Sequence, residues 1–98
     1  MDALELIRNA DCAADVLAAL AVYTRSLRDV PAIPEWCVRL PIEGESDVSR
    51  RMAAMYSAVN LASRNLLDRE CRIAKHALRV FAAAAWRLRR LARRRVER

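Results

Sequence analysis

The sequence predicts an all-α fold, a small bundle of three main helices. Three observations predict it. The 98-residue chain has one glycine, three prolines, two tryptophans, two tyrosines and one phenylalanine, so it lacks the turn chemistry and strand-forming residues of a β fold. Alanine, leucine and arginine dominate, and all three favour helices. Apolar residues recur at alternating steps of three and four, the period of an amphipathic helix. At this length we expect one domain, residues 1–98.

The first helix is predicted over residues 3–28. Asp2 and Glu5 have the spacing of a capping box, although Ser or Thr is the usual cap. The apolar or small residues that form its stripe are Leu6, Ala10, Ala13, Leu17, Leu20, Thr24 and Leu27. A second interpretation stays open, in which the helix breaks near residues 9–11 and Asp11 caps a new helix.

A connector over residues 29–46 follows, and it contains all three prolines and the single glycine. Proline lacks the backbone donor and clashes with the preceding turn, so no helix continues through this segment. Its apolar residues are Ile33, Trp36, Val38, Leu40 and Ile42. They predict an ordered connector that packs on the helices rather than a solvated loop.

Two further helices are predicted over residues 47–65 and 68–96. Their apolar stripes point about 90° apart on a common axis, so one continuous helix would not keep a single face on the core. Asn65 can end the first of these helices and Asp68 can cap the second. Because short connections join antiparallel neighbours, we expect an up-down-up arrangement.

The net charge of +6 is unevenly distributed. Residues 1–49 carry nine acidic and four basic side chains, whereas residues 50–98 carry fourteen basic and three acidic ones. This asymmetry predicts either a basic partner-binding surface or two halves that neutralise each other. In an up-down-up bundle the acidic connector lies beside the basic end of the last helix. The connector and Trp36 then cover Trp86 and much of the basic face, and the last turns from Arg93 remain exposed.

The strongest candidate site is the basic face of the last helix. Its residues are Trp86, Arg87, Arg89, Arg90, Arg93, Arg94 and Arg95. Arginines neutralise phosphates and release counterions, and an indole can stack on an unpaired base. The pattern therefore indicates nucleic-acid backbone binding without sequence specificity. A lesser alternative is association with an anionic membrane surface.

The function we expect first is nevertheless a non-enzymatic protein–protein interaction or assembly module, with nucleic-acid binding second. The end of the last helix is expected to extend beyond the other helices. There, Leu88, Leu91 and Val96 form an apolar strip that predicts self-association or a protein partner. One glycine permits no phosphate-binding loop, and three scattered cysteines with one histidine give no zinc spacing. No catalytic, cofactor or metal site and no small-molecule substrate are predicted.

The expected location is the cytoplasm. The longest uncharged run, residues 52–63, is shorter than the ~20 residues of a membrane-spanning helix. Acidic residues precede the first basic one, unlike in a signal peptide. The three cysteines, an odd number with no close pair, favour a reducing compartment.

Overall fold

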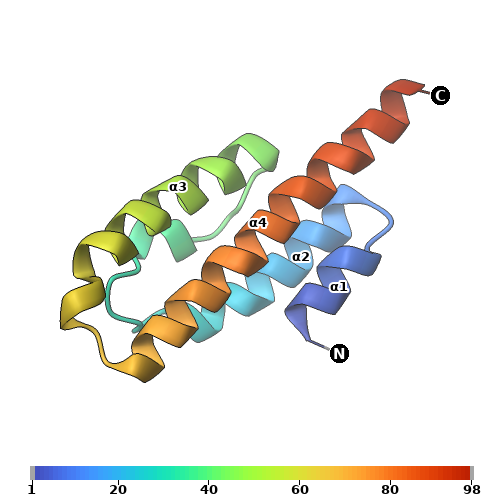
Figure 1. Cartoon of the computed structure of the whole chain (residues 1–98). Helices are drawn as coiled ribbons and strands as arrows, with labels where there is room; N and C mark the ends of the chain where they lie inside the picture. The colour runs from blue at the N-terminus through green and yellow to red at the C-terminus, as the bar shows by residue number, and fades with distance from the viewer. Residues whose placement is uncertain (1, 98) are drawn as a thin grey trace.

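The computed structural model describes the backbone of residues 2–97 and the side chains of residues 2–95. It has four α-helices, α1 (Ala3–Asn9), α2 (Ala13–Thr24), α3 (Glu45–Ala62) and α4 (Asp68–Glu97) (Figure 1). Short 3-10 turns lie between them, η1 (Arg25–Leu27), η2 (Glu35–Val38) and η3 (Ser63–Asn65). No strand occurs in the part of the chain that the structure describes, and the predicted all-α class is confirmed.

The predicted first helix is two helices, so the expected count of three was too low. Asp2 caps α1, because its carboxylate accepts a hydrogen bond from the N–H of Glu5 at 2.9 Å. The helix ends where Ala10 turns extended, with ψ 134°. Cys12, not Asp11, is the N-cap of α2, and its side chain makes no capping bond. The break near residues 9–11 is therefore present.

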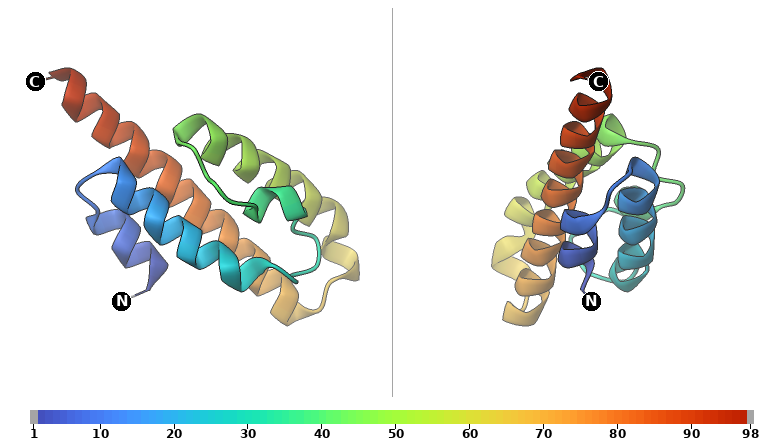
Figure 2. Two further views of the ribbon diagram at one scale, coloured as in Figure 1. Left: turned by 180° about the vertical axis from the view of Figure 1, so that it is seen from behind. Right: turned by 90° about the vertical axis from the view of Figure 1, so that its right-hand side faces the viewer.

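α2 and α3 both run antiparallel to α4, so the predicted up-down-up order is wrong (Figure 2). The ring of Tyr23 in α2 lies 5.8 Å from the ring of His76, early in α4. At the other end of α2, the carbonyl of Ala10 accepts a hydrogen bond from Arg87, late in α4. Consecutive helices pack as antiparallel neighbours when a short connection joins them. The segment between η1 and α3 is long enough to return along the bundle, so α3 starts at the same end as α2.

The connector is ordered and packs on the core, as predicted. Cys37, Val38 and Ile42 are buried within it. After α3, η3 and a short turn lead into α4, where the carboxylate of Glu70 accepts a hydrogen bond from the N–H of Leu67 at 2.9 Å. Two separate helices are therefore present where the stripes of residues 47–65 and 68–96 predicted them.

α4 is the central helix of the core and contacts all three others. Phe81 and Val80 are fully buried, and buried alanines at positions 77, 84 and 85 allow the neighbouring backbones to approach closely. The C-terminal end of α4 projects past the start of α3 and the α1–α2 turn (Figure 1). None of the described helices combines the length and the apolar composition that crossing a bilayer requires.

Candidate polyanion-binding surface

The apolar side of α4 is covered by the chain itself. Leu88 and Leu91 are 5% and 7% exposed and belong to the same core cluster as Ala10, Ile42 and other residues from before α3. The predicted self-association strip is therefore wrong for these two residues, because tertiary packing already buries them. The side chain of Val96, its third member, lies outside the described residues.

The opposite side of α4 carries a basic surface centred on Trp86. This side chain is 55% exposed, and the guanidinium carbon of Arg90 lies 4.8 Å from its ring centroid. Two open hollows, of about 560 and about 410 Å³, adjoin the pair. Together with Trp86, the arginines that line them form what we term the Trp86 surface: Arg8, Arg79, Arg87, Arg90, Arg93 and Arg94. None of the described residues lining either hollow is acidic.

Four predicted arginines lie on this surface, and two do not. Arg89 and Arg95 are exposed but line neither hollow. Arg79 and Arg8 line the larger hollow and were absent from the predicted set. Arg79 precedes Trp86 by seven residues, about two helical turns, so helical spacing does place it on the same side of the helix as Trp86. No local pattern indicates Arg8, because it comes from α1.

Arg87 connects the two helices that build the surface. Its Nε donates a hydrogen bond of 2.9 Å to the carbonyl of Ala10, just past the end of α1. Carbonyls at helix ends lack intrahelical partners, so this bond satisfies one of them. It also fixes α1 against α4, and Arg8 in the last turn of α1 thereby joins Arg87 around one hollow.

The acidic connector reaches only one arginine of the basic helix end in the described structure. The carboxylate of Glu45 accepts hydrogen bonds from Arg89 at 2.8 Å and from Ser49 at 3.1 Å. These bonds, that of Arg89 foremost, hold the pKa of Glu45 below its usual value. Since the connector returns along the bundle, only its last residues lie near this end of α4. The predicted covering of Trp86 by the connector and Trp36 is therefore wrong.

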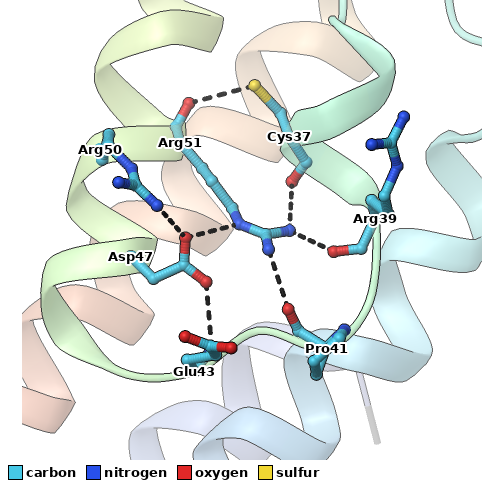
Figure 3. A network of polar contacts seen from close by, with 7 residues as sticks. All are labelled: Cys37, Arg39, Pro41, Glu43, Asp47, Arg50 and Arg51. Atoms are coloured by element: carbon cyan, nitrogen blue, oxygen red, sulfur yellow. Dashed lines mark hydrogen bonds and ion pairs between the residues drawn. The ribbon is translucent and has the colours of Figure 1, made fainter.

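A buried arginine, which the sequence analysis did not single out, ties the connector to α3. Arg51 is 7% exposed, and its Nε donates to Oδ1 of Asp47 at 3.0 Å. Its terminal nitrogens donate to the backbone carbonyls of Cys37, Arg39 and Pro41 (Figure 3). One guanidinium thus provides hydrogen bonds to three backbone carbonyls of the connector. Nothing in the local sequence distinguishes Arg51 from the other arginines.

Asp47 belongs to the same network of hydrogen bonds. Besides Arg51, it accepts from the guanidinium of Arg50 at 3.2 Å and from the N–H of Glu43 at 3.0 Å. Burial alone raises the pKa of this carboxyl, but the bonds from Arg51 and from the Glu43 backbone outweigh it and leave the pKa below its usual value. Asp47 is therefore ionised at neutral pH and acts within the fold.

The buried thiol of Cys37 offers little chemistry. All three cysteines are unpaired. Burial raises the pKa of the Cys37 thiol against the opposing charge of Arg51, and Sγ points at the Arg51 carbonyl 3.6 Å away. A raised pKa keeps a thiol protonated and unreactive at neutral pH. Within the described residues, no three His, Cys, Asp or Glu side chains are grouped to hold a metal ion.

The Trp86 surface is thus an exposed, positively charged feature built from two helices, with an aromatic ring at its centre. Its chemistry suits an anionic ligand with several phosphates or carboxylates. No protein-family model, curated protein or solved structure matches this chain.

Proposed function

We propose that this chain is a non-enzymatic binding module whose Trp86 surface binds the phosphate backbone of a nucleic acid without sequence specificity. One observation supports it above all. Six guanidinium groups from two helices surround an exposed indole, and the described lining contains no acid. Guanidinium groups stay charged and bind phosphate oxygens in pairs, and each neutralised phosphate releases counterions.

The order of the two functions expected from the sequence is reversed in this proposal. Protein–protein assembly rested on Leu88, Leu91 and Val96; the first two are buried, and the side chain of Val96 lies outside the described residues. Nucleic-acid binding rested on the basic face, and Trp86 remains exposed on it. The C-terminal end of α4, which carries Arg93 and Arg94, projects beyond the rest of the bundle (Figure 2).

A salt series tests the proposal. The full chain is titrated against fluorescently labelled oligonucleotides, and binding is followed by anisotropy. Contacts to about five phosphates give a slope of log K against log salt near −3.5 for a single strand and near −4.5 for a duplex. Affinity should therefore fall at least about 100-fold between about 50 and 200 mM salt.

Two triple variants with the same change in net charge locate the binding. Arg90→Gln, Arg93→Gln and Arg94→Gln together should weaken binding at least about tenfold and reduce the slope by about 2. The matched control replaces three exposed arginines near the other end of α4, Arg64, Arg69 and Arg72. It should leave the slope nearly unchanged. Equal losses in both triples, or no binding at about 50 mM salt, would contradict the proposal.

A groove between α1 and α2 supports a second candidate function, self-association of the chain. It has a volume of about 660 Å³ and a largely apolar lining that includes Val22 and Leu6, 65% and 45% exposed. Exposed apolar surface of this kind often marks an interaction site. Light scattering should then give a mass above 11.1 kDa that Val22→Asp reduces to 11.1 kDa. A mass of 11.1 kDa at every concentration would exclude self-association.

We also propose a cytoplasmic setting, on the basis of the cysteines. Cys12 is exposed, Cys37 is buried and Cys71 is half-buried, all unpaired. Thiols in this state are typical of reducing compartments.

A further inference from the structure

We infer that the nucleic acid bound by the Trp86 surface is single-stranded, and that an unpaired base stacks on the Trp86–Arg90 pair while phosphates on both sides of it reach the two groups of arginines. This inference rests on the function proposed above and names its ligand class. Trp86 and Arg90 are the two residues shared by both hollows. Arg8, Arg79 and Arg87 line the hollow on one side, and the other is lined by Arg93 and Arg94.

The stack is already partly formed in the protein. The guanidinium of Arg90 lies over the indole of Trp86 at 4.8 Å. Bases stack on guanidinium planes as they do on aromatic rings, so a base can continue the stack on the outer plane of Arg90. A duplex keeps its bases paired and stacked internally and offers no such face along its length. The stacking contribution is therefore available to a single strand only.

The arginines are spaced along α4 so that an extended single-stranded nucleic acid could contact them in succession. From Arg79 to Arg94 the surface follows α4 for about 22 Å, at ~1.5 Å per residue. Arg8 widens it at one end, since α1 packs beside α4. Roughly four nucleotides, the size of the smaller single-strand sites, fit this length. Phosphates can then contact arginines before and after the stacked base.

A membrane surface is a poorer match for the same charges. A helix that lies in the headgroup region needs an exposed apolar face to insert into the lipid. The apolar face of α4 around Leu88 and Leu91 is buried against the rest of the chain. Trp86 is instead surrounded by arginines.

The test compares a labelled single strand of about 12 nucleotides with the duplex of the same sequence, using the full chain at about 100 mM salt. We expect the single strand to bind about tenfold more tightly. Trp86→Leu should remove most of this difference by weakening the single strand and changing duplex affinity less than about twofold. Arg90→Lys keeps the charge but loses the planar group, so it should act in the same direction. Arg72→Lys, an exposed position of α4 outside the Trp86 surface, and Trp36→Phe are the matched controls and should preserve the preference.

The outcomes separate the inference from the function beneath it. Trp86 is exposed, so Trp86→Leu should fold normally; urea unfolding checks this, and Arg90→Lys provides the same test independently. Two results overturn the inference and leave phosphate binding in place. One is salt-dependent binding with equal affinity for the single strand and the duplex; the other is an equal effect of Trp86→Leu on the affinities for the two. Absence of binding to both oligonucleotides overturns both. Binding to vesicles containing phosphatidylserine without binding to either oligonucleotide also overturns both and assigns the surface to membranes.

Discussion

Replacing Arg51 by methionine tests how the connector is held to the bundle. Arg51 is nearly buried and donates to the carboxylate of Asp47 and to three connector carbonyls. Methionine fills a similar volume but leaves Asp47, whose side chain is 12% exposed, without its main partner. Removing one member of a buried ion pair costs about 3–5 kcal/mol. Asp47 keeps its bonds from Arg50 and the Glu43 backbone, so we expect about 3 kcal/mol.

Urea unfolding followed by circular dichroism measures this free energy. Arg50→Met is a close control, because Arg50 pairs with the same carboxylate but its side chain is 73% exposed. Exposed pairs contribute roughly 0–1 kcal/mol, so this variant should unfold almost as the wild type does. Arg51→Lys should fall between the two, since lysine keeps the charge and loses the planar fork. If Arg51→Met and Arg50→Met were equally stable, the reasoning about the network would be refuted.

Three further predictions concern the core, the α1 attachment and alkaline pH. Phe81→Ala should destabilise the fold by about 3–5 kcal/mol, measured by urea unfolding, because Phe81 is fully buried. Arg87→Met should cost about 1 kcal/mol and speed hydrogen exchange in α1 more than in α3, since the bond to Ala10 is lost. Burial raises the pKa of Tyr23 to about 12. Its phenol therefore ionises in the unfolded state first, and stability should decrease from about pH 10 upward, less steeply in Tyr23→Phe.

At acid pH, stability should also decrease, because the carboxylate of Asp47 in the Arg51 network becomes protonated. The pKa of Asp47 is lower in the folded chain than its usual value. Its contribution to stability is therefore fully present above about pH 4 and is lost as the pH falls further, through the folded pKa. Arg51→Met removes the main partner of Asp47, so this variant should lose less stability than the wild type over that range.

Local periodicity was sufficient to predict where the chain is helical and the break between the last two helices, but not the number of helices. The turn of residues 63–67 followed from the change in direction of the apolar stripe, whereas the break at residues 9–11 was only an open alternative to one helix over residues 3–28. The direction of α3 relative to α2 was not accessible in this way. It depends on whether the connector runs back along the length of the bundle before α3 begins. Neither the prolines nor the apolar spacing specify the path of this 18-residue segment.

The Trp86 surface was predicted only as far as one helix extends. Arg90, Arg93 and Arg94 share a side with Trp86 by helical spacing alone. Arg8 reaches the same surface only because α1 folds back onto α4, and Arg89 turns toward α3 because Glu45 is there. Leu88 and Leu91 looked unpartnered for a similar reason, since the core cluster that contains them is built from residues of several elements distant in the sequence.

The central claim, that the Trp86 surface binds a nucleic acid, is tested most directly by the two indole N–H signals of the chain in a ¹H–¹⁵N spectrum. Both tryptophans are partly exposed, so Trp36 serves as an internal control for Trp86. During titration with a single-stranded oligonucleotide, the Trp86 signal should shift or broaden while that of Trp36 stays in place. The shift should disappear when about 1 M salt is added. A stationary Trp86 signal, or equal movement of both signals, would contradict the proposed site.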